Sequence, residues 1–181
     1  MKKILLLFAF LWVQTFVHAQ FNVGANAIVQ FPQGDFKFSS LVSYGGSASV
    51  GYTFDQRVDL SFVYTAYFYD MHNFDINSKM VEAKFFFFNG NARPYIGCGV
   101  GIFSKTIPFR YAPQERENVW GYEPKVGILL DSKMLRNLFI DASVTYFKAN
   151  TKFNDPQAFN VAVGLKYMMD WEKVAGNYRK I

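Results

Sequence analysis

Seven charged residues occupy inner positions of segments that are otherwise apolar. In the strand register that these segments predict, all seven point into the interior of a barrel: Asp59, Glu82, Lys84, Glu123, Lys125, Asp141 and Lys166. A single charge inside a narrow barrel is unfavourable, whereas acids and bases on neighbouring strands neutralise one another. Such a set fits a salt-bridged plug, or alternatively a gate or proton path. Because eight strands leave no continuous aqueous channel, we favour the plug.

Enzymatic chemistry has little support in this sequence. A nucleophile needs a base within hydrogen-bond reach, and after residue 19 the only histidine is His72, in a predicted loop near Asp70, Asp75 and Ser78. No His-x-Ser arrangement accompanies it. We interpret His72 as a solvated loop residue, with a catalytic Asp-His-Ser set as the open alternative. One histidine is also a poor basis for a transition-metal site, so we expect no enzyme activity, no metal and no cofactor.

The segment 97–101 has glycine at every second position, around Cys98 and Val100. It superficially matches a dinucleotide-binding loop, but no helix follows that could aim amides at a pyrophosphate. We therefore interpret these glycines as the small face of a strand, with Cys98 on the opposite face as a small apolar residue. Cys98 is the only cysteine, so an intramolecular disulfide is excluded.

We expect strands to hold these residues in place. Large apolar residues recur at every second position of the segments concerned, and this is the pattern of a strand whose two faces meet different environments. Each is close to the ~9 to 11 residues that a tilted strand needs to cross a bilayer. The expected strands are 22–31, 43–54, 58–69, 79–88, 93–103, 121–130, 138–148 and 158–168. Connections alternate between short ones, including a turn at Asn89-Gly90, and longer ones. This asymmetry is typical of outer-membrane barrels.

Side-chain size separates a membrane barrel from a soluble, lipocalin-like one. One face of the predicted strands carries large residues such as Tyr52, Phe62 and Phe159, and the other carries small ones such as Gly51, Ser61 and Gly127. The large set would overfill an eight-stranded lumen but has unlimited room in lipid. We therefore predict an all-β, eight-stranded antiparallel up-and-down transmembrane barrel.

Three segments carry a family resemblance: 29–36 (VQFPQGDF), 93–101 (RPYIGCGVG) and 161–167 (VAVGLKY). With them the chain resembles the small outer-membrane β-barrel family related to OmpX and the OmpA membrane domain, in the versions common in Bacteroidota. The resemblance implies insertion by the outer-membrane barrel-assembly machinery. It also implies a C-terminal insertion signal, matched here by Gly164, Tyr167 and Met169, with Ala162 in the usual polar position.

The first residues have the order of a secretory signal peptide: Lys2 and Lys3, an apolar stretch, then Val17-His18-Ala19. We predict cleavage after Ala19, a single barrel domain over 20–169 and a short periplasmic tail over 170–181. The expected location is the outer membrane of a Gram-negative bacterium. Without Lys2 and Lys3 the chain is only mildly basic, so nucleic acid is not an expected partner.

The predicted loops mix both signs of charge, which is typical of solvated loops, although basic residues at the rim could pair with lipopolysaccharide phosphates. One loop differs because it carries large apolar groups beside a cation. These residues are Ile107, Phe109, Arg110 and Tyr111. They could fold over the barrel mouth or dock on an envelope protein partner.

These features predict a non-enzymatic outer-membrane barrel with a plugged polar lumen, acting structurally or as an accessory subunit of an envelope complex. A narrow autonomous pore is the alternative, and a lipid-modifying enzyme is a weaker one. The expected surroundings are outer-membrane lipid and lipopolysaccharide.

Overall fold

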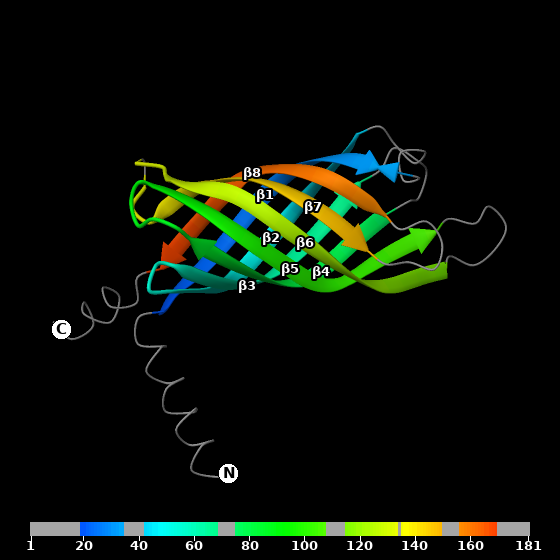
Figure 1. Ribbon diagram of the computed structural model, residues 1–181, viewed down its shortest axis with the longest axis horizontal. Coiled ribbons are helices and arrows are strands. Elements are labelled where there is room, and N and C mark those ends of the chain that lie inside the picture. The colour runs from blue at the N-terminus through cyan, green and yellow to red at the C-terminus, as the bar shows by residue number, and fades with distance from the viewer. Residues whose placement is uncertain are drawn as a thin grey trace, which may run out of the picture.

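The computed structural model describes residues 19–34, 42–68, 75–107, 115–133, 135–149 and 156–169, and these form a closed antiparallel β-barrel (Figure 1). Its strands are β1 Ala19–Gln33, β2 Ser43–Phe54, β3 Val58–Phe68, β4 Asp75–Phe86, β5 Ala92–Ile107, β6 Glu115–Asp131, β7 Leu138–Ala149 and β8 Gln157–Met169. Each strand pairs with its neighbours in sequence, and β8 closes on β1. The predicted fold class, an eight-stranded up-and-down barrel, is confirmed.

The two ends of the barrel differ in their connections. One end, here called the turn end, carries the short connections β2–β3, β4–β5 and β6–β7, the start of β1 and the end of β8 (Figure 1). The opposite end is called the loop end. At the β2–β3 turn, Asp55 and Gln56 have φ of 47° and 55°, and the Arg57 amide donates to the Phe54 carbonyl at 3.0 Å. Two successive positive φ values match the turn that suits strand twist in a hairpin.

Several strand boundaries differ from those predicted. β4 begins four residues earlier than expected, at Asp75, and ends at Phe86. β5 ends at Ile107 and β6 begins at Glu115. The prediction that residues 104–107 and 115–120 are loop, between strands 93–103 and 121–130, is therefore wrong, and Ile107 ends a strand. The apolar alternation stops at Phe103, but the ladder continues between polar residues, as in the register pair Lys105 and Glu117. Strands pair through backbone N–H and C=O groups, so a ladder can continue where the side chains no longer form an apolar outer face.

The turn at Asn89-Gly90 also differs from expectation. Its residue types favour positive φ. Among the described residues, however, positive φ occurs at Gly34, Asp55, Gln56, Lys133 and Asn137 only, so this turn uses ordinary backbone angles. Arg93 supports it instead, because its Nε donates to the Gly90 carbonyl at 3.1 Å.

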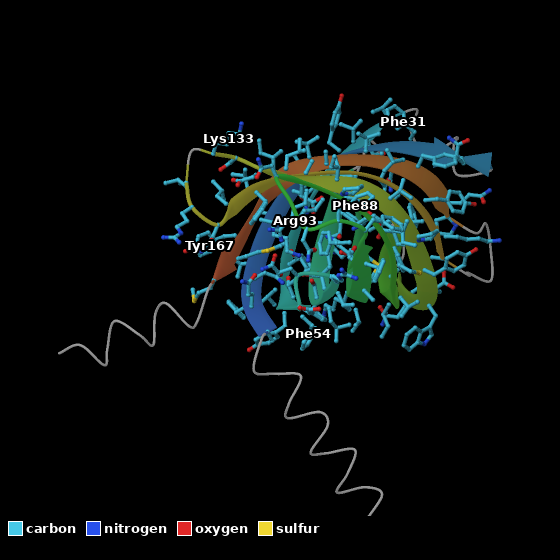
Figure 2. All side chains as sticks on the ribbon, turned by 60° about the vertical axis from the view of Figure 1, so that its left-hand side comes forward. Phe31, Phe54, Phe88, Arg93, Lys133 and Tyr167 are labelled. Carbon is cyan, nitrogen blue, oxygen red and sulfur yellow. The ribbon has the colours of Figure 1, made fainter. Side chains whose placement is uncertain are left out.

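The outer face of the barrel is almost continuously apolar. Large side chains that are 40% or more exposed follow every strand, for example Phe62 on β3, Val126 on β6 and Val163 on β8. Aromatic rings lie toward both ends, with Phe54 and Tyr167 at the turn end and Phe31 at the loop end (Figure 2). Such an exterior suits hydrocarbon between two interfaces that favour aromatic rings.

The inner face contains more large residues than the sequence pattern indicated. Tyr67, Tyr95, Phe103 and Phe147 lie inside with at most 2% exposure. Glycines make room for two of these rings: a Cβ at Gly121 would lie 2.6 Å from the Phe103 ring, and one at Gly127 would lie 2.6 Å from the Tyr95 hydroxyl. The small inner residues therefore leave space that a few large rings fill.

Candidate functional site

All seven charged residues predicted to face the lumen lie inside the barrel. Six are buried, with at most 6% exposure, and the side chain of Lys125 is 11% exposed. They come from β3, β4, β6, β7 and β8, so no single strand forms the cluster. The ladder brings Asp59 and Lys84 together as register partners on β3 and β4.

Asp59 is the centre of the first group of contacts. Lys166 Nζ lies 2.7 Å from Asp59 Oδ2. The same oxygen accepts hydrogen bonds from Asn22 Nδ2 and Thr53 Oγ1, each at 2.7 Å, and Ser61 Oγ donates to Asp59 Oδ1. Asp59 is fully buried, so this carboxylate exchanges water for one ammonium and three neutral donors.

The second group joins Glu82, Lys84, Lys125 and Asp141. Lys84 Nζ lies 2.9 Å from Glu82 Oε1 and 3.3 Å from Asp141 Oδ2, and Lys125 pairs with Glu82 Oε2. The Tyr95 hydroxyl donates to Asp141 Oδ1 at 2.6 Å, and Lys84 Nζ lies 5.0 Å from the centre of the Tyr95 ring. We call the two groups together the ion-pair layer, which comprises Asp59, Glu82, Lys84, Lys125, Asp141 and Lys166.

Glu123 is the predicted lumen charge that the ion-pair layer does not include. Its side chain is buried, with 5% exposure, and Oε2 has no hydrogen-bond partner among the described residues. On β6 it lies at the next inner position beyond Lys125 toward the loop end. Sequence position alone did not distinguish it from the paired carboxylates.

Apolar side chains close the lumen on the turn-end side of the ion-pair layer. They form one buried cluster, called here the turn-end cluster: Phe86, Tyr95, Leu129, Phe139 and Met168. The Phe86 and Tyr95 rings meet edge to face with centroids 5.5 Å apart. The Arg93 guanidinium lies 4.8 Å from the Phe139 ring centre, at the same end.

Three rings occupy the lumen on the loop-end side. Phe147 lies between Tyr67 and Phe103, with centroid distances of 5.9 Å and 5.4 Å and nearly parallel planes. We call these three residues the aromatic stack. Ile28, Ile76 and Met80 belong to the same buried cluster, and Asn160 Nδ2 donates to the Tyr67 hydroxyl at 3.1 Å. This stack was not predicted from the sequence, although its residues keep the inner phase of their strands.

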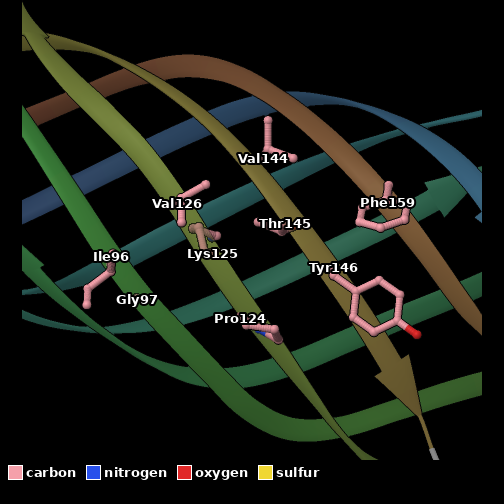
Figure 3. A pocket seen from close by; sticks show the side chains of 9 residues that line it. All are labelled: Ile96, Gly97, Pro124, Lys125, Val126, Val144, Thr145, Tyr146 and Phe159. Carbon is pink, nitrogen blue, oxygen red and sulfur yellow. The ribbon is translucent and has the colours of Figure 1, made fainter.

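The outer wall has a groove of about 370 Å³ where the β6–β7 ladder is interrupted (Figure 3). Tyr122 pairs with Lys148 and Lys125 pairs with Thr145, but the two residues between them on β6 form no register pair with β7. One of these two is Pro124, which has no N–H to donate to the ladder. Tyr146 and Phe159 form one side of the groove, with ring centroids 5.1 Å apart. Lys125 and Thr145 contribute to its floor, although both side chains point into the lumen.

The other predicted site residues are placed as follows. In β8, Gly164 lies on the inner phase, Tyr167 faces outward with 39% exposure and Met169 ends the strand. Cys98 is exposed on the outer face, as predicted from its position in β5. His72, Phe109, Arg110, Tyr111, the predicted signal peptide up to residue 18 and the tail from residue 170 lie outside the described residues.

Neither a metal-ion cluster nor a membrane-spanning helix occurs among the described residues. No group of three or more His, Cys, Asp or Glu residues is arranged for a metal ion within the described ranges. No helix in the described part of the chain is long and apolar enough to span a membrane.

The closed eight-stranded ladder and the apolar exterior define the class of this molecule, which has the fold of the small outer-membrane β-barrels related to OmpX and the OmpA membrane domain. Neisserial surface protein A has a TM-score of 0.70 at 16% identity, over 82% of this chain and 97% of that one. The N-terminal β-barrel domain of Pseudomonas aeruginosa OprF has a TM-score of 0.56 at 22% identity, over 82% and 99%.

The attachment invasion locus protein Ail of Yersinia pestis, in complex with the heparin analogue sucrose octasulfate, has a TM-score of 0.55 at 16% identity, over 83% of this chain and 97% of that one. The sequence matches no protein-family model and no curated protein. The likenesses in structure confirm the predicted barrel family as a fold. Function has to be argued from the residues of this chain.

Proposed function

We propose that this protein is a non-enzymatic, integral outer-membrane β-barrel whose lumen is plugged, and that it acts structurally or as an accessory subunit of an envelope complex. On this proposal the exterior and the loop end carry the function, while the interior holds the barrel in one shape.

Three successive layers across the lumen support the plug. The turn-end cluster, the ion-pair layer and the aromatic stack each consist of buried side chains from several strands. The observation that carries the proposal is the ion-pair layer, where Lys84 on β4 contacts Glu82 on its own strand and reaches Asp141 on β7 across the lumen. Long side chains that bridge an eight-stranded lumen leave little room for a hydrated path.

The outer membrane is the environment that fits this molecule. Exposed residues such as Phe62, Val126 and Val163 suit hydrocarbon, and the signal-peptide pattern before Gln20 provides a route of export. Gly164, Tyr167 and Met169 then serve the barrel-assembly machinery during insertion. Lipopolysaccharide and an envelope protein are the proposed contacts of the mature barrel.

Solute uptake tests the plug directly. Proteoliposomes that contain the pure barrel are expected to take up no small sugars, whereas vesicles with an open porin, prepared in parallel, swell. Brisk uptake by the wild-type barrel would overturn the plugged lumen and favour the narrow pore. One observation favours that alternative: the Lys125 side chain, which pairs with Glu82, is 11% exposed and is the most accessible charge of the ion-pair layer.

Co-purification tests the accessory role. The tagged protein would be extracted from native outer membranes in mild detergent, and every co-eluting protein would be quantified. A stoichiometric envelope protein is expected. Elution of the barrel alone would contradict the accessory role and leave a structural one.

A further inference from the structure

The described lumen contains one more carboxylate than ammonium group. Lys166 pairs with Asp59, Lys84 contacts Glu82 and Asp141, and Lys125 pairs with Glu82. Among the side chains that the structure describes, no lysine or arginine forms an ion pair with Glu123. An ionised carboxylate that is buried without a counter-charge is strongly unfavourable, so this position calls for a positive partner.

Two further buried side chains, on the two strands that follow β6 around the barrel, have oxygens without a partner among the described residues. Thr145 and Asn160 are 3% and 1% exposed, and Thr145 Oγ1 and Asn160 Oδ1 accept no hydrogen bond from the described residues. The two are direct register partners on β7 and β8. Thr145 is also the register partner of Lys125, so Glu123, two positions along β6, lies diagonally across from Thr145. Diagonal cross-strand neighbours lie about 7–8 Å apart.

The inner wall beside Glu123 is packed less tightly than the wall beside the aromatic stack. Its register partner on β5 is Gly99, and a Cβ built at Gly99 would meet nothing closer than Met80 Sδ at 3.4 Å and Glu123 Cβ at 3.8 Å. Those are ordinary contacts. One step away, a Cβ at Gly121 would lie 2.6 Å from the Phe103 ring. The lumen is therefore tightly filled at the aromatic stack and looser beside Glu123.

We infer that Glu123, Thr145 and Asn160 bind one small monovalent cation of the sodium type inside the barrel. A carboxylate, a hydroxyl and an amide carbonyl are all oxygen ligands, the kind that hard cations prefer. A single positive charge balances the single excess carboxylate, whereas a divalent ion would leave an excess of the opposite sign. The aromatic stack and the ion-pair layer lie on either side of the site and limit its exchange with water.

The test measures thermal unfolding of the full-length protein, folded in detergent, in sodium chloride and in choline chloride at equal ionic strength. The wild type is expected to melt about 3 °C higher in sodium, with a saturable dependence on concentration. Glu123→Gln is expected to melt at the same temperature in both salts. Asp55→Asn, which removes an exposed carboxylate at the β2–β3 turn, is the matched control and should keep the full sodium effect.

A direct binding readout keeps the proposal testable if Glu123→Gln does not fold. Broadening of the ²³Na resonance by the wild-type protein should be reduced at least threefold in Thr145→Val. A sodium effect that persists in Glu123→Gln, or no sodium effect in the wild type, would overturn the site. Equal melting of the wild type in both salts together with a more stable Glu123→Gln would also overturn it, because a proton would then neutralise Glu123.

Discussion

The two halves of the lumen are filled in different ways. Toward the turn end, the carboxylates Asp59, Glu82 and Asp141 each contact a lysine, and neutral side chains donate further hydrogen bonds to Asp59 and Asp141. Toward the loop end, the lumen is filled by the parallel rings of the aromatic stack, and polar oxygens such as Thr145 Oγ1 have no partner within the described part of the chain.

The lumen of this barrel is therefore blocked in two ways, by ion pairs in one half and by stacked rings in the other. Ion pairs inside a barrel are specific, because removing one partner leaves the other buried and charged. Stacked rings depend on shape, so their contribution follows the volume that a substitution leaves unfilled. The two halves should therefore respond differently to matched substitutions.

The largest effect is expected for Lys166→Met. The change leaves Asp59 fully buried without its ammonium partner, and breaking a buried pair in this way costs about 3–5 kcal/mol. Urea unfolding of the detergent-folded barrel measures it. Adding Asp59→Asn to the same chain should recover part of the lost stability. If Lys166→Met alone were as stable as the wild type, the ion pair between Lys166 and Asp59 would not stabilise the barrel.

Phe147→Ala is expected to follow, with a loss of about 3 kcal/mol, because it removes the middle ring of the aromatic stack. The same unfolding measurement applies. Phe159→Ala is the control on the outer face, where the ring is 46% exposed and lipid or detergent refills the space. If the two substitutions had equal effects, the stack would not be a packed layer.

The smallest effects are expected for the removal of one hydroxyl group from each half of the lumen. Tyr95→Phe removes the donor to Asp141 and should cost about 1–2 kcal/mol. Ser78→Ala removes a buried hydroxyl in the loop-end half that has no partner among the described residues, and it should leave the melting temperature unchanged. A larger loss for Ser78→Ala than for Tyr95→Phe would reverse the comparison.

Much of the fold could be predicted from particular residues. The large residues at alternate positions in 43–54 predicted β2 with the bounds that the structure has. At β5 and β6 the prediction failed, because Thr106 and Arg116 pair through their backbones without any apolar pattern to indicate it. The structure places all seven predicted lumen charges inside, but their pairing and the exception of Glu123 were not predictable.

The sequence by itself determined which side of the wall each residue occupies. Alternation is a local property, and a strand directs successive side chains to opposite faces whatever its neighbours are. Tertiary structure alone decided which inner residues meet. Lys166 reaches Asp59 across 107 positions of sequence only because β8 closes on β1 in one register and Gly121 and Gly127 leave space for the rings of Phe103 and Tyr95. Register and closure depend on all eight strands together, so no single segment encodes them.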